Sequence, residues 1–562
     1  MKKRLLSLIL ALCIIISFSP STLAANLPEV DVRTEGLTPA QPQEAPAEKP
    51  RDAGAERRTI YVSNEGTEED DGATAETPTT LARATELANE GKKPVEIVVL
   101  GQVSVDTWTS PTVETTLRGG DENAELLFEY CSASDGAYNI SLADALTIDE
   151  IKFNCNYTDY FFSRYYGTYT IVANGYPLVI ASGVQYSYYT ADTIVDGKTC
   201  STSSCYVIGG GLDEDITGGT HVEIYTSLPL TYVYGGGVNG SVESNVYLHI
   251  ENCGKIQHVR AGGYANKKDA KVNGNITLDF INSVTDNPIY GGGYARSSYS
   301  AEVTGSICIN LSGLNNGFGR PIYGGGYGKN APVVGNITFN ISNTKMNNNA
   351  AAIYGGGYDS DVTGDIFIHI KENSLISEET VWGGGTGDST ITGGVTITVD
   401  DSSEVIGEIR AGGNEGADVI GDVVITVSGG PQSACPTIFA TGKGEDEDNP
   451  AQVDGNVSIT LHGSRANVYT LDKFGEVTSD HTVTIILDDT DELSGAVRGD
   501  SKLDQHLYNH EKDNPTRTGN GASVIVKGDY TSTGIHGFPE VVIEDGGILR
   551  EHLASGETLF DG

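Results

Sequence analysis

A six-residue motif built around three glycines recurs along this chain and constrains its fold more than any other feature. Ile289-Tyr290-Gly291-Gly292-Gly293-Tyr294 returns at residues 322–327 and 353–358. The fifth position is Gly in nine aligned copies. Measured between these glycines, the eight intervals average about 29 residues. A period of this length is typical of a solenoid of stacked rungs. The looser copies begin at Val207, Val233, Val259, Val381, Ile409 and Ile438.

Alternating apolar residues follow the glycine triplets. Val272 to Phe280, Val303 to Leu311 and Val333 to Ile341 each place an apolar residue or Gly at every second position, and the pattern continues to Leu461. Period two over nine residues predicts a strand with one buried face. A propeller blade needs a longer repeat, and a leucine-rich repeat needs a Leu ladder that this chain lacks. The repeat therefore predicts an all-β parallel β-helix with one coil per period.

The second motif position indicates which side of the strand faces water. Two copies carry Arg260 and Arg410 there, and an arginine is not expected unpaired in an apolar bore. We therefore expect the first position to point inward and the second outward, with an aromatic strip on the surface that could stack on sugar rings. The alternative is that stacking between rungs only stabilises the solenoid. The predicted ligand-contact residues are Tyr234, Arg260, Tyr264, Tyr290, Tyr294, Tyr323, Tyr327, Tyr354, Tyr358, Trp382 and Arg410.

The first ordered segment resembles the start of a known family. Tyr61-Val62-Ser63 is followed by an Asp71-Gly72 loop, Pro78, a helical pattern from Thr80 to Asn89 and an apolar strand from Val95 to Leu100. This order is similar to that of pectin-lyase-like right-handed β-helix proteins. The resemblance implies a right-handed solenoid whose open end is capped by the short helix, and it suggests the surface or adhesin-like members of Gram-positive bacteria. The need for a cap is physical, because the first rung exposes strand edges and core.

The chain divides into five predicted segments. They are a signal peptide at 1–24, a disordered Pro/Ala/Glu-rich linker at 25–57, the cap and irregular first rungs at 58–205, regular rungs at 206–461 and degenerate rungs at 462–562. Lys2, Lys3 and Arg4 precede a 14-residue apolar run, which is short for a spanning helix and typical of an export signal. An uncleaved anchor is the alternative. We expect an extracellular or cell-surface protein that spans no membrane once the signal is cleaved.

The net charge and the possible metal ligands limit the classes of partner and metal ion that the chain could bind. The formal net charge of −41 disfavours nucleic acid and anionic membranes. The acidic run 445–449 could hold Ca²⁺, although it is also typical of a solvated loop. His506 and His510 with Glu511 would share a face only on a helix, and no Cys-x-x-Cys occurs. We therefore assign no metal site and no cofactor beyond a possible Ca²⁺. Cys200 and Cys205 are close enough to bridge.

No catalytic residue can be assigned from the sequence. Asp400-Asp401 and Asp488-Asp489 are adjacent pairs, and neighbours on a strand point to opposite faces. The leading hypothesis is a non-enzymatic adhesion, matrix or glycan-contact protein whose partner is an extracellular glycan or a host or cell-wall surface. The first alternative is a polysaccharide lyase or glycoside hydrolase acting on an extracellular polysaccharide. The second is a structural stalk for a missing C-terminal domain.

Overall fold

The computed structural model describes residues 57–561 with internal gaps. The gaps are 129–137, 156–167, 187–193, 196–197, 200–203, 229, 255, 315–317, 347–351, 378–379, 430–435, 446–449, 473, 479–480, 489–493, 499–521, 537, 539, 545 and 552–559. The predicted signal peptide, nearly all of the predicted linker, most of the acidic run, Cys200, His506, His510 and Glu511 thus lie outside the described residues.

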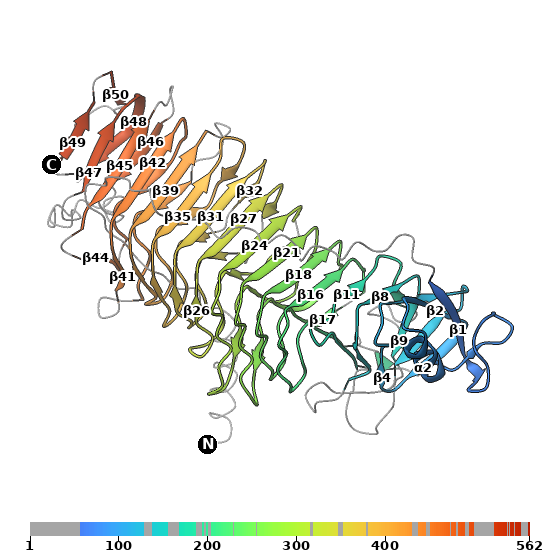
Figure 1. Cartoon of the computed structure of the whole chain (residues 1–562). Helices are drawn as coiled ribbons and strands as arrows, with labels where there is room; N and C mark the ends of the chain where they lie inside the picture. Colours follow the sequence, from blue (N-terminus) through green and yellow to red (C-terminus); the bar gives the residue numbers. More distant parts are fainter. Residues whose placement is uncertain are drawn as a thin grey trace. The chain divides into compact units, whose positions relative to one another are not determined.

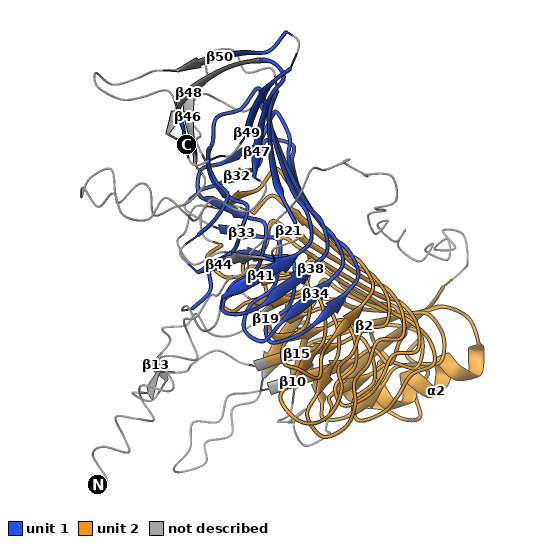
Figure 2. Cartoon of the chain, turned by 90° about the vertical axis from the view of Figure 1, so that its left-hand side faces the viewer, with its two compact units in different colours: residues 1–39, 352–562 blue, residues 40–351 orange. Residues whose placement is uncertain are grey.

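Two compact units make up the chain (Figure 2). We call residues 40–351 the N-terminal unit, and residues 1–39 with 352–562 the C-terminal unit. Each is a parallel β-solenoid, and the rungs average about 29 residues, as the glycine spacing predicts. Among the strand pairs that the structure describes, all are parallel apart from the small antiparallel pair β13 (Ile194–Val195) and β14 (Lys198–Thr199).

The predicted N-terminal helix is confirmed. It is α2 (Leu81–Gly91), which follows β1 (Arg58–Thr67) and precedes β2 (Val95–Val99) in the chain (Figure 1). The side chain of Thr80 accepts a hydrogen bond from the backbone N–H of Arg83, as an N-cap residue should. The helix ends at Lys92 in the left-handed region, and its Leu81, Ala84, Leu87 and Ala88 are buried. Trp108 ties it to the solenoid by donating to Thr85 Oγ1 over 2.9 Å.

The longer strands of the N-terminal unit stack into one parallel sheet, which we call the long-strand sheet. Inward side chains such as Leu248 and Leu278 are fully buried, whereas alternate positions lie on the outer face. After β1 and β2 the sheet continues in pairing order through β5 (Thr115–Gly119), β8 (Leu146–Asp149), β11 (Leu178–Ile180), β16 (Thr220–Ile224), β18 (Val246–Glu251), β21 (Ile276–Ile281), β24 (Ile307–Ser312) and β27 (Ile337–Ser342).

A second sheet of the N-terminal unit carries the glycine motif, and we call it the triplet sheet. Its later strands each end at a triplet. Gly293 does not need a left-handed backbone, because close approach is what excludes a side chain there: an added Cβ would lie 2.0 Å from the carbonyl oxygen of Ala301. The strands are β4 (Trp108–Thr109), β7 (Ile140–Ser141), β10 (Thr168–Val172), β15 (Ser204–Ile208), β17 (Leu230–Tyr234), β19 (Ile256–Arg260), β22 (Ile289–Tyr290) and β25 (Ile322–Tyr323).

Shorter strands complete the rungs of the N-terminal unit. One four-stranded sheet contains β3 (Gln102–Val105), β6 (Glu125–Phe128), β9 (Lys152–Cys155) and β12 (Gln185–Tyr186). The others are β20 (Tyr264–Ala265), β23 (Tyr294–Ala295), β26 (Val333–Val334) and β28 (Lys345–Met346).

The C-terminal unit repeats this plan. Its long strands are β31 (Ile366–Lys371), β35 (Val395–Val399), β39 (Val423–Ser428), β42 (Val457–His462), β45 (Val483–Asp488), β47 (Ser523–Val526) and β49 (Glu540–Ile543). Its triplet strands are β29 (Ile353–Tyr354), β33 (Thr380–Trp382), β37 (Glu408–Arg410), β40 (Thr437–Phe439), β43 (Asn467–Tyr469), β46 (Ser494–Arg498), β48 (Asp529–His536), β50 (Ile548–Glu551) and β51 (Phe560–Asp561). The remaining strands are β30 (Val362–Thr363), β32 (Leu375–Ile376), β34 (Thr390–Thr392), β36 (Glu404–Val405), β38 (Asp418–Ile420), β41 (Ala451–Asp454) and β44 (Gly475–Val477).

Ordered rungs extend past the point where the sequence pattern fades. The strands predicted near Val483, Val524 and Val541 are present as β45, β47 and β49, and they pair in parallel one after another. Across the described part of the chain, we find no helix with the length and apolar character needed to cross a membrane.

Candidate functional site

The predicted aromatic strip has far less exposed surface than expected. Only 2% of Tyr234, 8% of Tyr290 and 4% of Tyr323 is exposed in the N-terminal unit. The expectation that these second-position side chains face water is therefore wrong. The same holds for Arg260 and Tyr294 in that unit and for Tyr354, Trp382 and Arg410 in the C-terminal unit, all of which are buried, whereas Tyr264, Tyr327 and Tyr358 are partly exposed.

The rings are buried because they pack on one another. Tyr290 stacks on Tyr323 with 5.1 Å between ring centroids, and Tyr294 stacks on Tyr327 at 4.3 Å. The two columns also meet edge to face, since the Tyr290 and Tyr294 rings are 5.4 Å apart. Between the columns lie glycines without side chains, so nothing holds the rings apart. We call this cluster the aromatic layer; it comprises Tyr232, Tyr234, Arg260, Tyr264, Tyr290, Tyr294, Tyr323 and Tyr327.

Arg260 belongs to the aromatic layer rather than to the solvent. Its guanidinium carbon lies 3.5 Å from the ring centroid of Tyr294 and 5.1 Å from that of Tyr264, and Nη1 donates to the hydroxyl of Tyr234 over 3.2 Å. Ring faces and a hydroxyl thus stabilise the charged guanidinium of Arg260, which the sequence had led us to expect in water. Burial raises the pKa values of Tyr234 and Tyr290 well above their ordinary range, so both hydroxyls stay neutral.

Arg410 occupies the equivalent position in the C-terminal unit and is also buried by partners. Its guanidinium carbon is 3.8 Å from the ring centroid of Phe439 and 5.2 Å from that of Trp382. Nε donates to Glu408 and Nη1 to Asp472, both over 2.7 Å. These contacts match the stabilising alternative that the sequence left open. Ligand contact by the layer remains a prediction, and it has little exposed ring area to support it.

A second set of side chains lies on the outer face of the long-strand sheet in the N-terminal unit. Strand register places Glu223, His249 and Asp279 side by side on β16, β18 and β21. The flanking outward positions hold His221 next to Tyr247 on β16 and β18. Tyr225 follows directly after β16, and Glu251 is the last residue of β18. Sequence reasoning missed this cluster because it followed the alternating apolar positions and did not compare the outward positions between rungs. Aligning those positions rung by rung would have revealed it.

Glu223 is fixed by two neighbours on its own strand. His221 Nε2 lies 2.6 Å from Glu223 Oε1, and the hydroxyl of Tyr225 donates to Oε2 over 2.9 Å. The hydrogen bond from His221 is the main reason that the pKa of Glu223 falls below its ordinary value, since burial acts in the opposite direction. Glu223 is therefore an ionised carboxylate that orients the ring of Tyr225.

His249 sits between two carboxylates. Nδ1 lies 3.3 Å from Asp279 Oδ2, and Nε2 lies 3.2 Å from Glu251 Oε2. Burial disfavours the charged imidazole, but the hydrogen bonds to Asp279 and Glu251 outweigh it and raise the pKa of His249. Asp279 is also buried, yet hydrogen bonds from His249, Asn310 and Tyr247 lower its pKa. The pair therefore favours an imidazolium beside a carboxylate.

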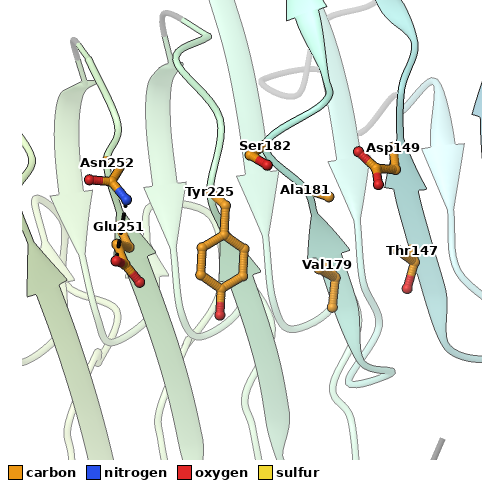
Figure 3. Close-up of a pocket in the computed structure, with 8 residues that line it drawn as sticks. All are labelled: Thr147, Asp149, Val179, Ala181, Ser182, Tyr225, Glu251 and Asn252. Carbon is orange, nitrogen blue, oxygen red and sulfur yellow. Dashed lines mark hydrogen bonds between the residues drawn. The ribbon is translucent and has the colours of Figure 1, made fainter.

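A hollow of about 380 Å³ opens beside this network (Figure 3). The ring of Tyr225 stands between Glu251 and Asn252 on one side and the β8 and β11 residues on the other (Figure 3). Its centroid is 5.1 Å from that of His249. Asn252 Nδ2 donates to Glu251 Oε1 over 3.2 Å. The full lining is Thr147, Asp149, Val179, Ala181, Ser182, Tyr225, Glu251 and Asn252.

Two other sequence candidates within the described residues have only local partners. Asp400 caps a turn, accepting from the backbone N–H groups of Glu372 and Ser402. His462 Nδ1 lies 3.2 Å from Asp488 Oδ2, but this pair is exposed and isolated. Among the residues that the structure describes, no group of three or more His, Cys, Asp or Glu side chains could hold a metal ion.

Comparison with known proteins adds no relative. No protein-family model, curated protein or solved structure matches this chain. The geometry of the hollow and of the network beside it is therefore the basis for assigning a function.

Proposed function

We propose that this chain is an exported, non-enzymatic β-helix protein that binds an extracellular glycan at the hollow beside Tyr225. One observation supports this most strongly: a single aromatic ring is flanked by carboxylates, an amide and hydroxyls around one hollow. Sugars present apolar C–H faces that pack on aromatic rings, and their hydroxyls need a few well-placed polar partners. The ring of Tyr225 and the oxygens of Glu251, Asp149 and Asn252 supply both.

The proposal includes two expectations from the sequence, namely export and a right-handed solenoid. The basic and apolar segment at residues 1–24 supports export to the extracellular space or the cell surface. The order of strand, loop, helix and strand at residues 60–100 supports a right-handed, pectin-lyase-like solenoid with an adhesin-like role. The contact site moves, however, from the aromatic layer to the hollow, because the layer's rings are occupied by one another.

A glycan array tests the proposal directly. The full chain is compared with Tyr225→Ala, and Tyr299→Ala serves as the matched control because Tyr299 is 41% exposed and does not line the hollow. Loss of one anchoring ring is expected to weaken binding about tenfold or more. Tyr225→Phe keeps the ring and loses the hydroxyl that donates to Glu223, so it should retain most binding. Unchanged array binding by a folded Tyr225→Ala protein would contradict the proposal.

One observation favours a second candidate, a polysaccharide-cleaving enzyme. On the same face, the pKa of Glu223 is lowered and that of His249 is raised, which pairs a proton acceptor with a proton donor near the hollow. The test is to incubate the protein with pectin, alginate and host glycans, with and without Ca²⁺. New reducing ends or unsaturated products that disappear in Glu223→Gln would establish it, and their absence would leave binding as the function.

A further inference from the structure

The hollow has an unbalanced charge. Asp149 and Glu251 line it, and none of its eight lining residues is Lys, Arg or His. Asp149 uses Oδ1 to accept the backbone N–H groups of Glu150 and Gly183, at 2.8 and 3.1 Å. Glu251 has 35% of its side chain exposed. A ligand that enters the hollow therefore meets two carboxylates and no positively charged lining side chain.

Basic groups near the hollow already have acidic partners. Arg118 is the register neighbour of Asp149 on β5, but its Nε donates to Glu96 over 2.7 Å and its Nη2 reaches the other oxygen of Glu96 at 3.3 Å. His249 lies behind Glu251, where Asp279 also bonds it. Each of these positive groups is matched by at least one carboxylate. His249 offsets part of the charge of Glu251, but it is shared with Asp279, so the hollow and its neighbours keep a net negative charge.

Tyr225 adds a surface that suits a cation. Its hydroxyl donates to the ionised carboxylate of Glu223, which pushes electron density into the ring. An electron-rich ring face attracts an ammonium group, and the attraction strengthens where water is partly excluded. An ammonium also brings three hydrogen-bond donors and no acceptor, which fits the carboxylate of Glu251 beside the ring. A uronate or sulfate group would instead be repelled.

We propose that the hollow selects glycans with free amino groups, of the glucosamine type, over neutral and acidic glycans. This inference rests on the proposed function and names its ligand class. One ammonium group lies at the carboxylate of Glu251, and its sugar ring packs on Tyr225. Asp149 lies three strands away at the other end of the hollow, where it can meet a second ammonium group of the same glycan. Acidic polysaccharides are excluded by the same two carboxylates.

Three tetrasaccharides represent the three charge classes. They are the tetramers of glucosamine, which is positively charged, of N-acetylglucosamine, which is neutral, and of galacturonic acid, which is negatively charged. Each is titrated calorimetrically into the full chain at low salt. The glucosamine tetramer is expected to bind about tenfold more tightly than the acetylated one, as a charge-assisted hydrogen bond would give. Glu251→Gln should remove that preference. Glu243→Gln makes the same charge change outside the hollow and should preserve it. Added salt should shrink the preference, because it screens exposed charges.

The outcomes separate this inference from the proposed function. Equal or tighter binding of the acetylated or the acidic tetramer overturns the amino-sugar inference while glycan binding at the hollow stands. A preference that survives Glu251→Gln also overturns it. If none of the three tetramers binds, the inference fails, and the array with Tyr225→Ala decides separately whether the hollow binds any glycan.

Discussion

Two columns of outward side chains in the N-terminal unit behave in opposite ways. In the aromatic layer, rings on either side of a glycine triplet close over the bare backbone and remove one another from water. On the long-strand sheet, Glu223, His249 and Asp279 stand in register on strands about 4.8 Å apart. Tyr225 and Glu251, at the next outward positions, stay partly exposed beside the hollow. What lies beside an outward residue thus decides whether it can meet a ligand.

The largest expected effect comes from deleting a ring of the aromatic layer. Tyr290→Ala should lower the free energy of unfolding by about 3–5 kcal/mol, because it removes a buried ring and leaves a cavity. Tyr299→Ala should change it by less than about 0.5 kcal/mol, as expected for an exposed side chain. Urea unfolding of the two variants measures both values. Equal costs would mean that the layer is an open surface after all.

A smaller effect is expected from adding one methyl group to the backbone beneath the layer. An added Cβ at Gly292 would lie 2.7 Å from the backbone nitrogen of Gly326. Neighbouring backbone cannot move aside cheaply, so Gly292→Ala should cost about 1–3 kcal/mol. Gly218→Ala is the control, because its Cβ would meet nothing within 4 Å. A tolerated Gly292→Ala would show that the rungs are less tightly stacked than the structure has them.

The smallest effect concerns pH and the network behind the hollow. The folded pKa of His249 is raised, so its stabilising contribution is present at low pH and is lost as pH rises through that value. The folded pKa of Asp279 is lowered, so its contribution is lost as pH falls through that value. Asp279→Asn should therefore destabilise most between these two pH values.

An NMR titration of His249 checks the same point. The pKa of His249 should fall in Asp279→Asn, because a hydrogen-bonding carboxylate is lost while the imidazole stays buried. Glu243→Gln should leave it unchanged. An unaltered His249 titration in Asp279→Asn would show that the two groups are not coupled.

The architecture could be predicted from the sequence because glycines and apolar residues recur at regular spacings. The spacing of the glycines set the rung length, and alternation such as Ile276, Leu278 and Phe280 identified the strands with their buried faces. The exposure of Tyr290 could not be predicted this way. A strand pattern predicts on which side of the sheet the ring of Tyr290 lies. It does not predict that Tyr294 and Tyr327 cover that ring.

The candidate site was hidden for a related reason. Tyr225 and Glu251 are 26 residues apart, the same spacing as Gly211 and Gly237, so aligning the rungs would have paired them. Asp149 belongs to the irregular rungs before the repeat array, and no repeat spacing marks it as their neighbour. Only the pairing of β8, β11, β16 and β18 in register brings them to one hollow. Irregular early rungs, with longer and less repetitive insertions, make that register hard to infer in advance.

Hydroxyl-radical footprinting of the tyrosines tests the central claim most directly. In the native protein, Tyr299 and Tyr225 should be modified readily, whereas Tyr290 and Tyr323 should react only after unfolding. A glycan that binds on the array should protect Tyr225 and leave Tyr299 unchanged. Rapid modification of Tyr290 and Tyr323 in the native protein, with glycan protection there and none at Tyr225, would contradict the account.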